Sequence, residues 1–133
     1  MAIQVVTTEQ STLFTIRTKH TTYQMKADEY GVLLHLWYGA SVEGDMSYLL
    51  DYPDVGFSGN LYEAENRRTY SLNTLPLEYA TEGVGDFRIP AVAATHADGS
   101  NALDLRYQSY NILKGKYAIA GLPAVYADED EAE

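Results

Sequence analysis

The run VLLHLWY, residues Val32–Tyr38, is the most apolar strand signal in the chain, and it decides the fold. Its side chains alternate between two largely covered faces, with Leu33, His35 and Trp37 on one and Leu34, Leu36 and Tyr38 on the other. A strand that is covered on both faces is typical of the middle of a sheet. We therefore expect a central strand here, with Trp37 in the core and His35 hydrogen-bonded.

Three further strand signals precede this run. Residues 3–6, 13–18 and 21–27 combine β-branched or aromatic side chains with two-residue alternation, which is typical of strands. Lys19 and His20 stand between the second and third signals, and we expect them to form the turn that joins these two strands. The N-terminal third thus predicts successive short strands.

The chain beyond Gly39 continues to predict strands. We expect them at residues 68–72, 87–95, 103–113, 117–120 and 122–126, with a hairpin turn at Asp98-Gly99 and an edge or bulge position for Pro90. Residues 45–50 fit either one helical turn or extended chain. Strand signals about every ten residues, without an amphipathic helix of ordinary length, predict an all-β sandwich of two packed, mainly antiparallel sheets.

Length and charge narrow the classes of protein and partner. A chain of 133 residues fits one domain, which we place at residues 1–127, followed by an acidic tail at residues 128–133. The five carboxylates of the tail supply half of the formal net charge of -10. Nucleic acids and anionic membranes bind clustered Lys and Arg, so neither is an expected partner of this moderately acidic body.

Cysteine content and the N-terminal segment bear on localisation. The chain has no cysteine, which excludes disulfides and thiolate chemistry and is compatible with the cytoplasm. The first ten residues lack the basic region and apolar run of a cleaved signal, and no window approaches the ~20 apolar residues of a membrane span. We therefore expect a cytoplasmic protein.

The central stretch, residues Asp54–Pro90, is dense in Gly, Pro, Asn, Arg and acidic side chains. Its carboxylates Asp54, Glu78, Glu82 and Asp86 include candidates for the acid pair used in glycoside hydrolysis. The same carboxylates can instead cap turns or pair with arginines at positions 67, 68 and 88, and sequence spacing favours this second interpretation.

Other chemistries have little support in the sequence. The three histidines show no metal-binding spacing, and no phosphate-binding loop or nucleophile elbow is present, so we expect neither a metal nor a cofactor. Twelve tyrosines, one tryptophan and three phenylalanines are suited to stacking on sugars or to filling a core and an interface.

Motifs in the central stretch match a known family. They are D-x-x-F-S-x-N from Asp54 to Asn60, R-T-Y-S-L-x-T-L-P-x-E-Y from Arg68 to Tyr79, and G-D-F-R-x-P from Gly85 to Pro90, flanked by YGVLLHLWYG at 30–39, DLRY at 104–107, KGK at 114–116 and GLPAVY at 121–126. In this order, over nearly the whole chain, they resemble the N-terminal domain of the α-galactosidases (melibiases) of glycoside hydrolase family 36.

The resemblance implies the N-terminal β-supersandwich of a large enzyme that hydrolyses terminal α-galactosides of the melibiose or raffinose type with retention. The family's two catalytic aspartates lie in motifs of a central TIM barrel that are absent from this sequence. We therefore expect no catalytic residue here, an inactive isolated chain, and a tail that leads toward the barrel. The expected partners are the remainder of the enzyme, neighbouring subunits and the galactoside.

The resemblance also implies a substrate-binding pair. The family's substrate-contacting Asp and Arg fall on Asp54 and Arg68, a carboxylate and a guanidinium that can hydrogen-bond sugar hydroxyls and each other. Leu61 stands where the family often has Pro, a departure that bears on the path of the loop. Two alternatives remain open: an autonomous carbohydrate-binding module with a platform of coplanar aromatic rings, and a purely structural interaction domain.

Overall fold

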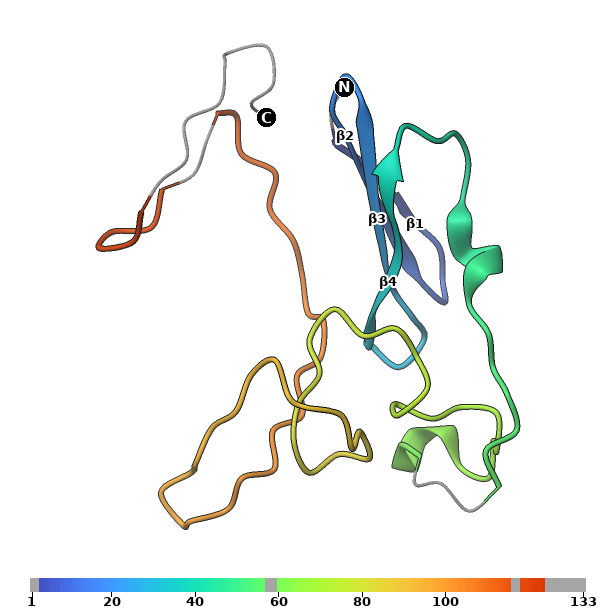
Figure 1. Ribbon diagram of the computed structural model, residues 1–133, viewed down its shortest axis with the longest axis vertical. Coiled ribbons are helices and arrows are strands. Elements are labelled where there is room, and N and C mark those ends of the chain that lie inside the picture. Colours follow the sequence, from blue (N-terminus) through green and yellow to red (C-terminus); the bar gives the residue numbers. More distant parts are fainter. Residues whose placement is uncertain (1–2, 57–59, 116–117, 124–133) are drawn as a thin grey trace.

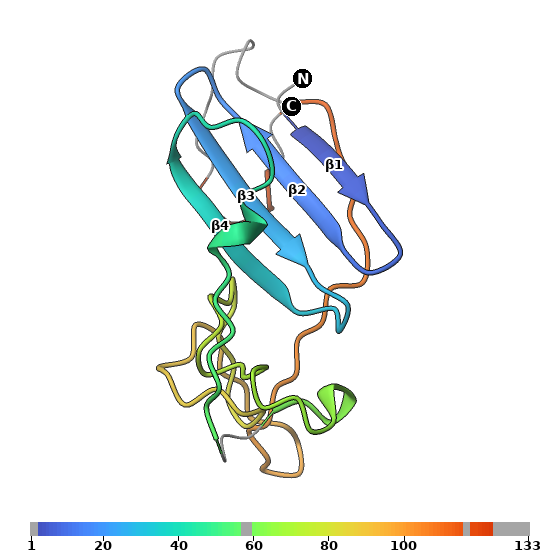
Figure 2. The ribbon, with the colours of Figure 1, turned by 90° about the vertical axis from the view of Figure 1, so that its right-hand side faces the viewer.

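The computed structural model describes residues 3–56, 60–115 and 118–123, and its regular structure is one antiparallel sheet. The strands are β1 (Ile3–Thr7), β2 (Thr12–Arg17), β3 (Thr21–Ala27) and β4 (Leu33–Ala40), in the order β1-β2-β3-β4, followed by two 3₁₀ turns, η1 (Met46–Leu49) and η2 (Tyr62–Ala64) (Figures 1 and 2). The all-β class and the four N-terminal strands are confirmed, and residues 45–50 take the helical alternative.

One face of the sheet is apolar and is covered by the C-terminal segment. Phe14 of β2 pairs with Met25 of β3, so both side chains lie on this face. Phe14 is buried edge-on against the rings of Tyr107 and Tyr110, with centroids 5.6 and 5.4 Å away. Figure 1 shows the segment that carries these tyrosines running along the sheet on the side opposite η1.

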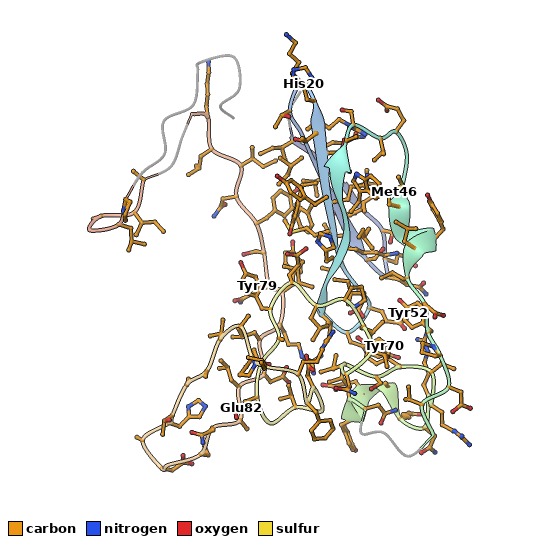
Figure 3. The ribbon with its side chains drawn as sticks, viewed as in Figure 1. His20, Met46, Tyr52, Tyr70, Tyr79 and Glu82 are labelled. Atoms are coloured by element: carbon orange, nitrogen blue, oxygen red, sulfur yellow. The ribbon has the colours of Figure 1, made fainter. Side chains whose placement is uncertain are left out.

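The other face carries a buried polar network that anchors η1. The Gln24 amide donates to the Thr15 hydroxyl at 3.0 Å and to the Gly44 carbonyl at 2.7 Å, while its oxygen accepts the Met46 N–H at 3.0 Å. Gln24 is fully buried, and leaving any of these groups unpaired would be costly. The network therefore holds Met46, labelled in Figure 3, against the sheet.

The prediction that Val32–Tyr38 is a central strand is wrong, because β4 ends the sheet. Among the described residues, its outer edge makes two backbone hydrogen bonds to the chain beyond it, from the His35 N–H to the Pro76 carbonyl at 2.7 Å and from the Glu78 N–H to the Leu33 carbonyl at 3.0 Å. The strand is apolar on both faces because the central stretch packs against it, not because strands flank it on both sides.

A β-bulge changes which side chains of β4 share a face. His35 pairs with Met25 and Trp37 with Gln24, so Leu36 has no partner in the ladder. Because a bulge places two residues of one strand opposite one of the other, His35 and Trp37 lie on different faces, contrary to the predicted alternation. Trp37 is half-buried instead of in the core, and its indole N–H donates to the Ala40 carbonyl at 3.2 Å.

The strands predicted at residues 68–72, 87–95 and 103–113 do not form. Alternation predicts extended chain, but a strand also needs a hydrogen-bonded neighbour, and the last of these segments makes only single bonds, such as the Tyr107 N–H to the Gly31 carbonyl at 2.7 Å. The turn at Asp98-Gly99 is present without flanking strands: the Gly99 N–H donates to the His96 carbonyl at 2.9 Å.

The last strand predictions fall largely at the edge of the described chain. Residues 118–123 form no strand, while 117, 124–126 and the acidic tail at 128–133 lie outside the described residues. The described residues contain one sheet, so the two-sheet supersandwich stays a prediction. Within the same residues, no helix has the length and apolar character that crossing a membrane requires.

The main core lies beyond the end of the sheet, where the central stretch meets β4. It is built from Val32, Leu34, Leu61, Ala64, Tyr70, Leu72 and Leu75. Tyr70 is only 1% exposed, and its hydroxyl donates to Asp28 Oδ2 at 2.6 Å. Burial, reinforced by this hydrogen bond, raises the pKa of the Tyr70 hydroxyl well above its ordinary value, so it stays a proton donor.

Removing this hydroxyl is expected to destabilise the domain. Tyr70→Phe leaves a part-buried carboxylate oxygen without its donor, and we expect a loss of about 1–3 kcal/mol in the free energy of unfolding. Urea titration followed by the fluorescence of the single tryptophan measures it. Tyr62→Phe is the matched control, because Tyr62 is 96% exposed. Equal unfolding free energies for the two variants would contradict the assignment.

Candidate functional site

Asp54 and Arg68, fourteen positions apart, meet at an exposed ion pair. Arg68 Nη2 lies 2.9 Å and Nε 3.1 Å from Asp54 Oδ1, so two nitrogens of the planar guanidinium converge on one carboxylate oxygen. The Asp54 side chain is 55% exposed and that of Arg68 is 64% exposed. Both side chains are therefore more than half accessible to a ligand. The structure thus brings the predicted pair together.

The backbone around Asp54 prepares this contact. The Gly56 N–H donates to Asp54 Oδ1 at 2.9 Å, and the Val55 N–H donates to the Arg68 carbonyl at 3.2 Å. Gly56 has φ +66°, a left-handed conformation that glycine adopts without a steric penalty. The Gly56 hydrogen bond, followed by those of Arg68 and its charge, lowers the pKa of Asp54, so the carboxylate is ionised at neutral pH.

Leu61 stands in a backbone conformation that a proline at this position would also adopt. Leu61 caps η2 with φ -63°, the value to which a proline ring is also restricted. Its side chain is 5% exposed and belongs to the core, so leucine adds apolar burial in a backbone conformation that either residue adopts.

Arg67 points away from the pair and closes a neighbouring pocket. Its guanidinium carbon lies 5.5 Å from the Tyr52 ring centroid and 5.6 Å from that of Tyr70, and its Nη1 donates to Glu29 Oε1 at 2.8 Å. Figure 3 shows the two tyrosines beside each other below the sheet. These residues line a polar pocket of about 150 Å³ that also includes Lys26. The adjacent residues Arg67 and Arg68 therefore bind different partners: Arg67 binds Glu29 and the two tyrosine rings, and Arg68 binds Asp54.

Glu78 lies in a cluster with Tyr23 and His35 that sequence reasoning missed. The Tyr23 hydroxyl donates to Glu78 Oε2, and His35 Nδ1 lies 3.0 Å from Oε1. Burial, followed by this hydrogen bond, raises the pKa of Tyr23. The partners are 55 and 43 positions away from Glu78, so no local pattern signals the cluster. The prediction that His35 is hydrogen-bonded is confirmed.

Asp86 forms a clamp with Arg88. Arg88 Nε and Nη2 donate to the two Asp86 carboxylate oxygens at 2.8 and 2.9 Å, and Nη2 also donates to the Leu72 carbonyl at 2.7 Å. Although burial acts to raise it, these hydrogen bonds hold the pKa of Asp86 below its ordinary value. The flanking side chains of Phe87 and Ile89 are 81% and 93% exposed.

The acidic candidates are therefore not assembled into an acid pair. Asp54, Glu78 and Asp86 each bind a partner of their own among the described residues, and Glu82 lies exposed on a separate loop, labelled in Figure 3. These contacts support the interpretation that the carboxylates pair with basic side chains, and not the catalytic interpretation. Glu78 differs from the prediction in that it pairs with a histidine instead of an arginine. In the described part of the chain, no group of three or more potential ligands is placed to hold a metal ion.

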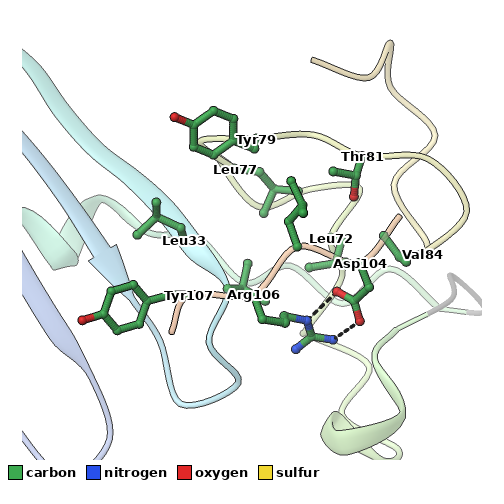
Figure 4. Close-up of a pocket in the computed structure, with 11 residues that line it drawn as sticks. Leu33, Leu72, Leu77, Tyr79, Thr81, Val84, Asp104, Arg106 and Tyr107 are labelled. Atoms are coloured by element: carbon green, nitrogen blue, oxygen red, sulfur yellow. Dashed lines mark hydrogen bonds and ion pairs between the residues drawn. The ribbon is translucent and has the colours of Figure 1, made fainter. Parts of the chain in front are cut away.

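An apolar pocket of about 190 Å³ lies between β4 and the C-terminal segment. Leu33, Leu77 and Tyr79 line one side of it, and Tyr107 and Arg106 line the other (Figure 4). Arg106 is fixed by Asp104 through Nε and Nη2, at 2.5 and 3.0 Å, and by the Tyr30 carbonyl at 2.7 Å. The Nε, Nη1 and Nη2 groups of Arg106 are thus each bonded to the protein itself. We therefore assign this pocket to the contact between β4 and the C-terminal segment and not to a ligand.

These features define a class of protein: an all-β module that presents a charged pair on a loop next to its core. Residues 31–133 match the family described as the glycosyl hydrolase family 36 N-terminal domain. This chain belongs to that family, which confirms the resemblance seen in its motifs.

Known relatives agree with this assignment. The chain is 51% identical over 121 residues to a bifunctional α-galactosidase/sucrose kinase, AgaSK, of Mediterraneibacter gnavus, covering 91% of this chain and 13% of that protein. The solved galactosidase domain of AgaSK superposes with a TM-score of 0.84 at 47% identity, over 95% of this chain and 18% of that one. The chain thus spans a small part of the length of the relatives it matches.

A further solved structure is a variant of the α-galactosidase AgaA of Geobacillus stearothermophilus in complex with raffinose. It is 36% identical to this chain, with a TM-score of 0.78, over 87% of this chain and 16% of that one.

Because both the Gly56 N–H and Arg68 lower the pKa of Asp54, we expect Arg68→Gln to reverse only part of this shift. Because the Gly56 N–H remains, the Asp54 pKa should rise but stay below its ordinary value of 3.8. Because the pKa of Asp54 is lower in the folded than in the unfolded state, its carboxylate stabilises the folded state at pH values above the unfolded pKa. This contribution is lost as the pH falls through the folded pKa. Carboxyl carbon chemical shifts across an acid titration measure both values. An unchanged pKa in the variant would refute the pairing.

Proposed function

We propose that this chain acts as the N-terminal domain of a retaining α-galactosidase that hydrolyses terminal α-galactosides of the melibiose or raffinose type. The proposal is supported by family membership, by relatives named α-galactosidases, and by the raffinose complex of AgaA. Within that enzyme the domain contributes to assembly and to substrate contact, and catalysis resides in another part of the polypeptide.

The observation that carries substrate contact is the exposed Asp54–Arg68 pair. An ionised carboxylate accepts hydrogen bonds from two sugar hydroxyls, and a guanidinium already held by that carboxylate donates through its outer edge. Both side chains are more than half exposed in this domain, so the pair is accessible to a ligand. A polar pair on a loop that packs next to a rigid core is a common arrangement for a binding site.

The proposed protein partners are the remainder of the enzyme and neighbouring subunits, in the cytoplasm. Support comes from large apolar side chains that the domain leaves uncovered, among them Phe87 and Ile89. The clamp between Asp86 and Arg88 spans Phe87, so it holds the backbone that carries the Phe87 side chain. Exposed apolar groups in defined positions are typical of a surface that packs against another protein surface.

The alternative of an autonomous carbohydrate-binding module has less support. Among the described residues, the one near-parallel ring pair is Tyr52 with Tyr70, at 24°, and Tyr70 is buried. Tyr38, which is exposed, meets Tyr23 edge-on at 62°. These pairs do not form the flat, open platform on which a sugar stacks.

Asp54→Ala in the full-length enzyme tests the substrate contact. The loss of charged hydrogen bonds to the sugar should lower kcat/KM for raffinose about ten- to a hundredfold, mainly through KM, while the oligomer persists. Steady-state kinetics and light scattering measure the two properties. Asp51→Ala is the matched control, because Asp51 is exposed and lies three positions away. Kinetics equal to those of the parent enzyme would exclude a substrate role for Asp54.

The isolated domain is expected to bind galactose too weakly to measure at millimolar concentration. Its candidate site supplies the Asp54–Arg68 pair and, among the described residues, no flat aromatic platform, whereas a sugar pocket needs several convergent groups. Isothermal titration calorimetry with galactose and raffinose measures this affinity. Saturable heat that Asp54→Ala abolishes would favour the autonomous binding module instead.

A further inference from the structure

Asn60 makes two hydrogen bonds that close the loop leading to Arg68. Its side-chain Nδ2 donates to the Glu65 carbonyl at 3.0 Å and to the Arg67 carbonyl at 3.1 Å. Both protons of one amide group are thus used on backbone oxygens five and seven positions away. The side chain bridges the start and end of a loop that contains η2.

The backbone of this loop requires such a bridge. Glu65 has φ +50°, and it is the one non-glycine residue of the described chain with a positive φ. That conformation is disfavoured for a residue with a Cβ and persists where its surroundings enforce it. The Glu65 N–H donates to the Tyr62 carbonyl at 3.1 Å, and Asn60 binds the Glu65 carbonyl, so the strained residue is held on both sides.

The second bond of Asn60 acts on the peptide group that begins Arg68. The Arg67 carbonyl belongs to the peptide plane that also contains the Arg68 N–H. This oxygen accepts from Asn60 and from the Tyr70 N–H at 3.0 Å. Two donors therefore fix the rotation of the Arg67–Arg68 peptide, from which the Arg68 side chain departs toward Asp54.

We propose that Asn60 is a positioning residue that aims Arg68 at the galactoside, an inference that rests on the proposed function of the Asp54–Arg68 pair. Asn60 acts through the backbone and does not contact the sugar. The guanidinium gains most from this fixation, because a planar fork binds well only over a narrow range of orientations. A long, 64% exposed side chain on an unfixed backbone would sample many others.

Kinetics of two Asn60 variants of the full-length enzyme test the proposal. Asn60→Ala removes both donors, and we expect KM for raffinose to rise about fivefold, with kcat within about twofold of the parent value. Asn60→Asp places a carboxylate against the two carbonyl oxygens, and we expect a larger rise. Asn66→Ala is the matched control, because Asn66 is exposed on the same loop. A KM unchanged in both Asn60 variants would overturn the proposal.

A double-mutant cycle with Arg68→Ala separates positioning from a general structural role. If Asn60 acts through Arg68, Asn60→Ala should change kcat/KM less than twofold once Arg68 is alanine. A loss in the Arg68→Ala background as large as in the parent would overturn the proposal. If Arg68→Ala alone leaves the kinetics unchanged, the substrate role of the pair fails instead. The two failures are therefore distinguishable.

Discussion

The carboxylate of Asp28 is the group on which most of this structure depends. Its Oδ1 accepts the backbone N–H groups of Tyr30 and Val32, both at 2.9 Å, and its Oδ2 accepts the buried Tyr70 hydroxyl. The first two bonds shape the turn between β3 and β4, and the third ties that turn to the central stretch. Gly31, at φ +74°, completes the turn and accepts the Tyr107 N–H, which brings in the C-terminal segment.

The exposed site follows from this buried anchor. Tyr70 is fixed in the core, and its N–H donates to the Arg67 carbonyl, which closes a turn that contains Arg68. The side chains of Arg67 and Arg68 point in different directions from this turn. Arg67 covers Tyr70 and pairs with Glu29, while Arg68 reaches Asp54 at the surface. The ion pair itself is solvent-exposed and adds little stability. Its geometry comes from the loop, in keeping with the proposed binding role.

Sequence patterns predicted the sheet well and the rest of the fold poorly, for a physical reason. In residues 3–40, apolar and polar side chains alternate because one face of the sheet is buried. Each strand there pairs with the next strand in the sequence, so its hydrogen-bonding partner is close along the chain. Residues 103–113 alternate as clearly, but a strand requires a partner, and alternation does not reveal whether one is present. The Asp54–Arg68 pair was found through family motifs. The cluster of Glu78 with Tyr23 and His35 depends on contacts between distant segments, which no short pattern records.

The central claim is that the Asp54–Arg68 pair contacts the sugar in the assembled enzyme. The most direct measurement is a crystal structure of the full-length protein with galactose bound. Our account predicts an Asp54 carboxylate oxygen at a hydrogen-bonding distance of about 2.7 Å from a galactosyl hydroxyl, with Arg68 still on the other oxygen. A bound galactose with Asp54 and Arg68 facing solvent, away from the sugar, would contradict it.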